Sequence, residues 1–155
     1  MDHQSFVQKI QEMRGQLYRT AYGYLGNPHE SMDAVDEAVF QAYRAWKQLR
    51  NEEHFKTWMT RILIHVCYKE LRRRKIETVV EDFPEKQEEE FDSLPVREAV
   101  RRLPEELRRV IVLRYFTGLT LSETAATLEI PQGTVATRQR RALSLLKIEL
   151  KEEDL

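Results

Sequence analysis

One stretch near the C-terminus has residue types suited to binding nucleic acid. At about 100° per residue, a helix beginning near Gln132 would place small, hydroxyl and basic side chains on one face. These side chains are Gly133, Thr137, Arg140, Arg141 and Ser144. Arginine binds phosphate or the edge of guanine, and a small residue early in the helix permits close approach to the groove. The pattern favours DNA binding, although a soluble helix with a solvated basic face would show it too.

A short helix is predicted immediately before this one. Thr120 and Glu123 have the spacing of a capping box, in which each side chain accepts from a free backbone N–H at a helix start. Ile130-Pro131 ends this helix, because proline lacks an N–H and keeps the preceding residue out of helical geometry. Two helices joined by such a turn form a helix-turn-helix, whose second helix enters the DNA major groove.

A second candidate surface lies on a helix predicted in the first half of the chain. Its basic and ring-bearing side chains, at steps of four, three and four, are Arg61, His65, Tyr68 and Arg72. Cations bind phosphates and rings stack on unpaired bases, so this line suits single-stranded nucleic acid, and an ordinary polar flank fits it equally well. The helix is predicted to end in Arg72-Arg73-Arg74-Lys75. Four adjacent cations exceed what helix capping requires, which favours a phosphate-facing cluster.

Apolar spacing predicts the helices that position these residues. Apolar side chains recur at steps of three and four from Phe6 to Leu25, which indicates an amphipathic helix ending at Gly26. Asn27-Pro28 starts a second helix, which reaches about Leu49. Its exposed side chains are Asp33, Asp36, Glu37, Gln41 and Arg44. Those charges alone favour a solvated face.

The third helix is predicted from Phe55, with a core stripe that includes Trp58 and Ile62. After Pro95, a short helix and another from Pro104 to Gly118 would complete a four-helix unit with the helix-turn-helix. No stretch suggests a sheet. The predicted fold is therefore all-α.

The distribution of charge over the 155 residues predicts two domains and a separator. Residues 1–76 have a net charge of +4, residues 77–95 of −7, and residues 96–155 of +2. The overall charge of −1 thus hides two mildly basic domains on either side of an acidic linker. Basic domains of this kind are compatible with nucleic acid as a partner.

Several classes of protein find no support in the sequence. There is no apolar run long enough to span a bilayer, and the polar N-terminus has no signal-peptide pattern, so we expect a cytoplasmic protein. The lone Cys67 excludes an internal disulfide and is expected to be a packing residue. No glycine-rich phosphate loop and no metal-ligand spacing is present. An enzyme, a cofactor and a metal are therefore not expected.

The order of these motifs resembles that of a bacterial RNA polymerase sigma factor of the extracytoplasmic-function (ECF) group, in the sigma-70 family. The resemblance extends over nearly the whole chain. Residues 33–43 resemble the segment that binds the polymerase clamp, and residues 55–62 with 72–75 resemble the element that opens and reads the −10 region. The pieces that resemble the −35-reading domain are residues 103–104, 113–116 and 133–142.

The resemblance implies a role for each surface. Core polymerase binding is expected of Asp33, Asp36, Glu37, Phe40 and Gln41. Capture of unpaired −10 bases is expected of Arg61, His65, Tyr68, Arg72, Arg73, Arg74 and Lys75. Reading of the −35 groove is expected of Gly133, Thr134, Thr137, Arg138, Arg140 and Arg141, with Arg114 on a phosphate. The implied function is to direct core RNA polymerase to promoters, restrained by an anti-sigma partner whose membrane anchoring is left open.

A few positions depart from the family pattern. Asp36 stands where glutamine is usual, His65 and Lys69 where asparagine and aspartate are usual, and Ala136 where lysine or arginine is common. The promoter sequence is therefore left open. Two other classes of protein also stay open at this point: a free-standing helix-turn-helix regulator that binds operators without polymerase, and a helical adaptor with no DNA role.

Overall fold

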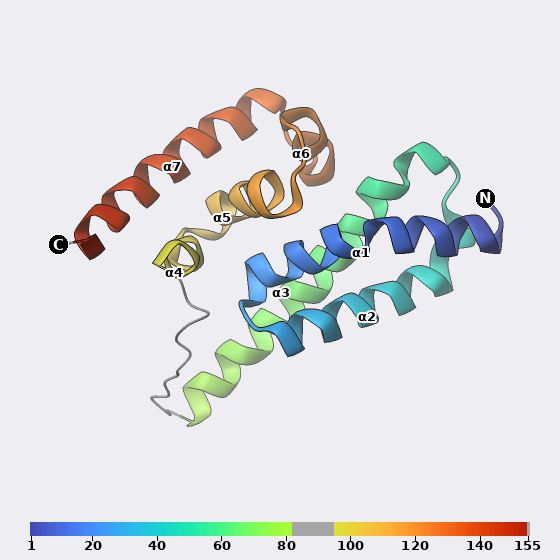
Figure 1. The fold of residues 1–155 in the computed structure, drawn as a ribbon, viewed down its shortest axis with the longest axis horizontal. Helices are drawn as coiled ribbons and strands as arrows, with labels where there is room; N and C mark the ends of the chain where they lie inside the picture. Colours follow the sequence, from blue (N-terminus) through green and yellow to red (C-terminus); the bar gives the residue numbers. More distant parts are fainter. Residues whose placement is uncertain (82–94, 155) are drawn as a thin grey trace.

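The computed structural model describes residues 1–81 and 95–154, and over these residues the chain is helical without a strand. The N-terminal domain consists of α1 (His3–Leu25), α2 (Pro28–Ala45) and α3 (Phe55–Glu81), with 3-10 turns at Trp46–Gln48 and Glu52–His54. The C-terminal domain consists of α4 (Pro95–Arg102), α5 (Glu105–Ile111), a π-helix (Val112–Thr117), α6 (Leu121–Leu128) and α7 (Gln132–Asp154). Figure 1 shows the second domain lying along one side of the α1–α2–α3 layer. The predicted all-α class is confirmed.

The predicted end of the first helix and the predicted start of the second are confirmed, whereas α2 ends at Ala45 and a 3-10 turn replaces its predicted last residues up to Leu49. Gly26 ends α1 in the left-handed conformation, with φ of 69°, where glycine has no steric penalty. Asn27 then caps α2, and its side chain accepts a hydrogen bond from the Glu30 N–H at 3.0 Å. These two caps make a tight corner, so α1 and α2 pack side by side.

Helix α3 extends beyond its predicted end at Lys75 and reaches Glu81. No glycine or proline lies between these two residues, so the local sequence does not interrupt the backbone hydrogen bonds of the helix at Lys75. Residues 77–81, which the charge distribution had assigned to the linker, are therefore the last residues of α3. The rest of the predicted linker, residues 82–94, lies outside the described residues.

The helix predicted to run to Gly118 changes its winding before it ends. Val112–Thr117 form a π-helix, and Gly118 closes it with φ of 87°. The side chains of Gln16 and Arg19 on α1 donate hydrogen bonds of 3.2 and 3.1 Å to the last two carbonyls of this π-helix. The prediction of one regular helix was therefore wrong in this turn, whose final carbonyls are satisfied by the neighbouring domain.

One apolar core extends through both domains. Leu17 and Met59 from the first domain belong to the same buried cluster as Val112 and Leu113 from the second. Helix α1 packs along the π-helix, and α3 packs against α6. The two domains therefore form a single closed body in this structure (Figure 1).

Cys67 lies in this core and is fully buried, as expected of a packing residue. Burial raises the pKa of its thiol to about 12, from an ordinary value of 9.0. The neutral thiol therefore contributes stability below about pH 9, and this contribution is lost as the pH rises from about 9 towards 12. We expect a maleimide to leave the folded chain unmodified at neutral pH and to modify it once in guanidinium chloride, as measured by mass spectrometry. Rapid modification of the folded chain would contradict this.

Candidate polymerase-binding and nucleic-acid-binding surfaces

The helix-turn-helix is built as its sequence predicts. The Thr120 hydroxyl accepts from the Glu123 N–H, and the Glu123 carboxylate accepts from the Thr120 N–H, each at 3.0 Å. Glu129 ends α6 with φ of 60°, and Pro131 then precedes α7. A small buried cluster joins α5, α6 and α7 through Val110, Ala125 and Val135. The relative position of the two helices is therefore set by packing as well as by the caps.

The predicted −35 surface of α7 divides into exposed and engaged residues. An added Cβ at Gly133 would meet no atom within 4 Å, so this end of the helix is open to a close-fitting ligand. Thr137, Arg140 and Arg141 are exposed, whereas Thr134 is partly buried. The Arg138 guanidinium is half-buried and forms an ion pair of 3.4 Å with Glu106 on α5. Arg138 thus links α7 to α5 through this ion pair, beside the exposed face of α7.

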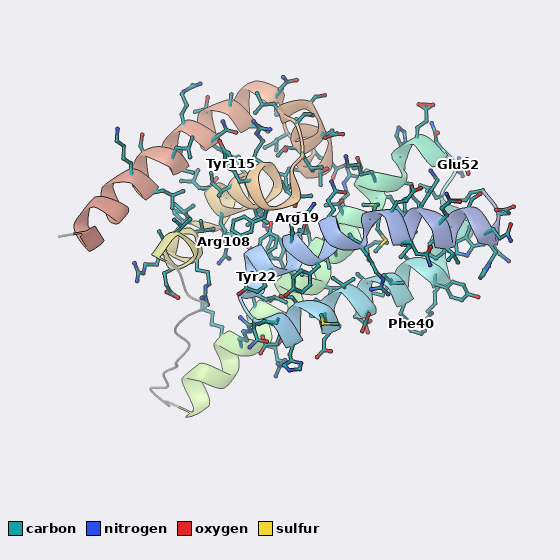
Figure 2. The ribbon with its side chains drawn as sticks, viewed as in Figure 1. Arg19, Tyr22, Phe40, Glu52, Arg108 and Tyr115 are labelled. Atoms are coloured by element: carbon teal, nitrogen blue, oxygen red, sulfur yellow. The ribbon has the colours of Figure 1, made fainter. Side chains whose placement is uncertain are left out.

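Arg114, expected on a phosphate, is held in place by two hydrogen bonds. Its Nε donates to the Gln139 side chain at 2.7 Å, and another nitrogen of the guanidinium donates to the Leu119 carbonyl at 2.6 Å. The guanidinium also lies 5.8 Å from the ring centre of Tyr115, an exposed side chain labelled in Figure 2. Arg114 is therefore oriented by α7 before any DNA is present.

Two of the predicted −10 residues contact the C-terminal domain. The Arg61 guanidinium donates to the Thr127 carbonyl at 2.9 Å and to the Ala126 carbonyl at 2.5 Å, at the C-terminal end of α6. The ring of Tyr68 lies 4.7 Å from the Arg109 guanidinium and is partly buried. Burial is the main reason that the pKa of Tyr68 is raised above its ordinary value.

The other predicted −10 residues of this face are more accessible. His65 and Arg72 are exposed and line a pocket of about 450 Å³ between α3 and the C-terminal domain. Arg61, Tyr68, Arg109 and Glu129 also line this pocket. The structure therefore brings the predicted line of four residues together on one face, with part of that face covered.

The four adjacent cations at residues 72–75 do not share one face, because successive helical residues are about 100° apart. Arg72 and Lys75 are exposed. Arg73 Nε donates to the Glu70 carboxylate at 3.1 Å. Arg74 points into the domain, where it pairs with Glu30 and donates to the Leu25 carbonyl at 3.0 Å.

The predicted polymerase-binding face of α2 is open to solvent. Asp33, Asp36, Glu37 and Gln41 are exposed, and Gln41 donates to the Glu37 carboxylate at 2.9 Å. Phe40 is 54% exposed and projects from α2 in Figure 2. The large apolar side chains that accompany it on this helix are Met32 and Tyr43. Carboxylates interspersed with exposed apolar groups are typical of a protein-binding surface.

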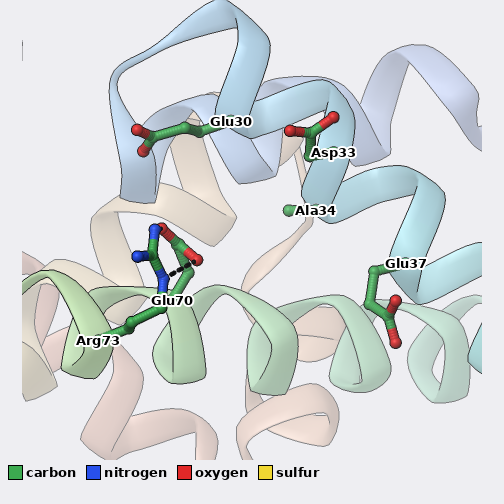
Figure 3. A pocket seen from close by; sticks show the side chains of 6 residues that line it. All are labelled: Glu30, Asp33, Ala34, Glu37, Glu70 and Arg73. Carbon is green, nitrogen blue, oxygen red and sulfur yellow. Dashed lines mark hydrogen bonds and ion pairs between the residues drawn. The ribbon is translucent and has the colours of Figure 1, made fainter.

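Figure 3 shows how the acidic face of α2 meets α3. Glu30, Asp33 and Glu37 on α2 lie across a pocket of about 300 Å³ from Glu70 and Arg73 on α3. The acidic side chains of α2 therefore lie around the Glu70–Arg73 pair. Arg73 is bound to Glu70 on the side of α3 that faces α2.

The chemistry of the described side chains gives no metal site. Among them, no group of three or more His, Cys, Asp or Glu residues is placed to hold a metal ion. A search of the same part of the chain finds no helix with the length and apolar character that crossing a membrane requires.

Comparison with known proteins identifies a family model for each of the two domains. Residues 10–76 match the family model for Sigma-70 region 2, and residues 99–147 match that for Sigma-70, region 4. RNA polymerase sigma factor SigV of Bacillus subtilis is 32% identical over 151 residues, which cover 94% of this chain and 91% of SigV. The ECF RNA polymerase sigma factor SigW of the same organism is 28% identical and covers 97% of this chain and 91% of SigW. The chain belongs to the sigma-70 family, as an ECF sigma factor.

This sigma factor also shares its fold with solved structures. CnrH, in complex with the cytosolic domain of CnrY, is 21% identical, with a TM-score of 0.77 over 97% of this chain and 90% of CnrH. RpoE of Bartonella quintana, in complex with the anti-sigma factor NepR, is 23% identical, with a TM-score of 0.76 over 95% of this chain and 97% of RpoE. Family membership supports a role in directing RNA polymerase to promoters over a free-standing regulator or an adaptor. The sigma factor is not an enzyme.

Sequence reasoning missed three residues of these surfaces in the sigma factor. Gln139 orients Arg114, Arg109 covers Tyr68, and Lys56 bonds Glu123 across the two domains at 3.2 Å. Each of them is a polar residue on a helix flank, and such positions have no periodic signal that distinguishes a tertiary partner from a solvated side chain. Only the packing of one domain on the other identifies them.

Proposed function

We propose that this sigma factor contacts core RNA polymerase and promoter DNA through three separate surfaces. The exposed face of α2 binds the polymerase clamp, the Arg61–Arg72 face of α3 captures unpaired −10 bases, and the exposed face of α7 enters the −35 major groove. The observation that supports this most is the exposed apolar and acidic face around Phe40 on α2, because large apolar side chains open to solvent beside carboxylates are typical of a protein-binding surface.

The two DNA-binding domains would gain selectivity from being held together. Each exposes only a few cations, which alone supply weak and salt-sensitive binding. Attachment to polymerase at α2 places both on one promoter, and the second contact then forms at a high effective concentration. We place the protein in the bacterial cytoplasm, where polymerase acts. We also expect an anti-sigma partner, because the structures of RpoE and CnrH each contain a protein bound to a related chain.

Run-off transcription tests this function directly. Core polymerase would be combined with the purified chain on a library of genomic promoter fragments, with core polymerase alone as the control. We expect discrete transcripts only when the chain is present. No transcript from any template, or a sharp operator footprint without polymerase, would contradict the proposal.

The −35 surface can be tested by reversing the charge of its exposed arginines. The double variant Arg140→Glu/Arg141→Glu is expected to lower the initial rate of transcription at least about tenfold, since contacts to bases or phosphates are each worth about 1–3 kcal/mol. Lys147→Glu, on an exposed position of the same helix, is the matched control and should have a much smaller effect. Equal rates for the double variant and the wild type would contradict the assignment.

A further inference from the structure

The pocket of about 450 Å³ between α3 and the C-terminal domain gathers more positive charge than its own residues neutralise. Its basic side chains are Arg61, His65 and Arg72 from α3 and Arg109 from α5. Among the described residues that line it, Glu129 is the one carboxylate, and its side chain is 75% exposed and pairs with Arg61 at 3.7 Å. A concave site with a surplus of cations attracts an anion.

Several polar groups on the walls of this pocket have no partner. In the part of the chain that the structure describes, His65 and Arg72 take part in no hydrogen bond and no ion pair. The Tyr68 hydroxyl and the Arg109 Nε are buried without a hydrogen-bond partner of normal geometry among the same residues. Buried donors without partners cost free energy, and a ligand rich in acceptor oxygens would satisfy them.

The size and spacing of the pocket narrow the class of anion. Arg61 and Arg72 are eleven positions apart on α3, or about 16 Å along the helix axis, so one phosphate group cannot contact both. The volume lies within the range of about 300–1,000 Å³ that is typical of small-molecule sites. Ile64 and Leu128 add an apolar wall beside the Tyr68 ring. This wall suits a flat organic group attached to a chain of phosphates.

Arg109 makes the pocket different from the α3 face alone. It belongs to α5 in the C-terminal domain, and its guanidinium lies 4.7 Å from the ring centre of Tyr68. Its ion pair with Glu105, at 3.4 Å, uses one terminal nitrogen. The guanidinium therefore keeps donors for a further anion.

We propose that this pocket binds a small polyphosphate anion, such as a nucleoside triphosphate, held jointly by Arg72 and His65 of α3 and by Arg109 of the C-terminal domain. The bound anion links the two domains. This site goes beyond the proposed function and does not depend on it, since no base or promoter takes part in the binding.

Isothermal titration calorimetry of the full chain in EDTA tests the site, with ATP, pyrophosphate and adenosine as the ligands. We expect ATP to bind with a stoichiometry of one and adenosine to bind at least about 100-fold more weakly, because it lacks the charge-assisted hydrogen bonds. Tighter binding of ATP than of pyrophosphate would identify a nucleotide, whereas equal binding would identify the phosphate groups alone. Both results support a polyphosphate site. No heat from ATP or pyrophosphate at millimolar concentration, or equal binding of adenosine, would overturn the proposal.

Substitutions in each domain test whether the site is shared. Arg72→Gln and Arg109→Gln should each weaken ATP binding about tenfold, the loss expected for one charged hydrogen bond. The matched controls, Lys47→Gln and Lys147→Gln, remove one exposed cation from each domain outside the pocket and should leave binding unchanged.

Circular dichroism checks the fold of each variant. If Arg109→Gln does not fold, Arg109→Lys decides the same question, because it keeps the charge beside Glu105 and loses the planar fork of donors, with an expected loss of several-fold. Loss in the Arg72 variant alone would place the anion on α3 only, and equal loss in the lysine controls would show binding to general surface charge. Either result would overturn the shared site, while the run-off assay would be unaffected.

Discussion

Reversing the charge of Asp33, Asp36 and Glu37 to lysine is expected to abolish capture of core RNA polymerase by this sigma factor. All three carboxylates are exposed on α2, and Arg14 approaches Asp36 only at 3.9 Å on the surface. The fold therefore loses little when they change. A basic patch on the polymerase that accepts these carboxylates would instead face three cations, and such like-charge contacts cost several kcal/mol. We expect affinity to fall at least about 100-fold, measured by co-purification with core enzyme.

A second triple reversal controls for net charge. Glu12, Glu52 and Glu53 are also exposed in the N-terminal domain but lie off the acidic face of α2. Their change to lysine alters the total charge by the same amount and should leave capture nearly intact. Equal capture by both triple variants and wild type would move the polymerase contact to another surface, while family membership would be unaffected.

Local sequence chemistry predicted the framework of the fold well. The caps at Gly26 and Asn27, and the capping box of Thr120 with Glu123, depend on residues within four positions of each other. The identity of such residues decides the backbone conformation wherever the chain folds. For this reason, the end of α1 and the starts of α2 and α6 could be predicted without knowledge of the packing.

Interactions between distant residues could not be predicted in the same way. Nothing in the local sequence pattern predicts the π-helix at Val112–Thr117, and its last two carbonyls accept hydrogen bonds from side chains 101 and 97 positions earlier in the chain. Arg61 and Tyr68 were expected on an open face, yet both contact the other domain. The helical period identifies a face, and it does not say which other element covers that face.

The basic run at residues 72–75 shows this limit most clearly. The sequence presents four equivalent cations, and each was expected to face phosphate. In the structure, Arg74 enters the corner between α1 and α2, where it satisfies the Leu25 carbonyl and pairs with Glu30. We therefore infer that Arg74 stabilises the N-terminal domain and that Arg72 is available to nucleic acid.

This division predicts opposite results for two neighbouring substitutions. Arg74→Met keeps most of the apolar stem and removes the charge, which leaves the Glu30 carboxylate and the Leu25 carbonyl with one partner fewer. The Arg74 side chain is about a quarter exposed. Loss of a fully buried pair would cost about 3–5 kcal/mol, and water relieves part of that at this site. We expect the free energy of unfolding to fall by about 2 kcal/mol, with a Tm lower by about 4–8 °C.

Arg72→Met, two positions away and exposed, should change the free energy of unfolding by less than about 0.5 kcal/mol. It should instead weaken binding of single-stranded DNA and reduce the slope of log K against log salt by about 0.7, the value for one lost phosphate contact. Urea unfolding and anisotropy titrations at several salt concentrations measure the two effects on the same samples. If Arg74→Met proved fully stable and lost the salt slope, Arg74 would be a phosphate ligand and its pairing with Glu30 incidental. The two arginines differ by 200° around α3, so one helix cannot present both to the same strand of DNA.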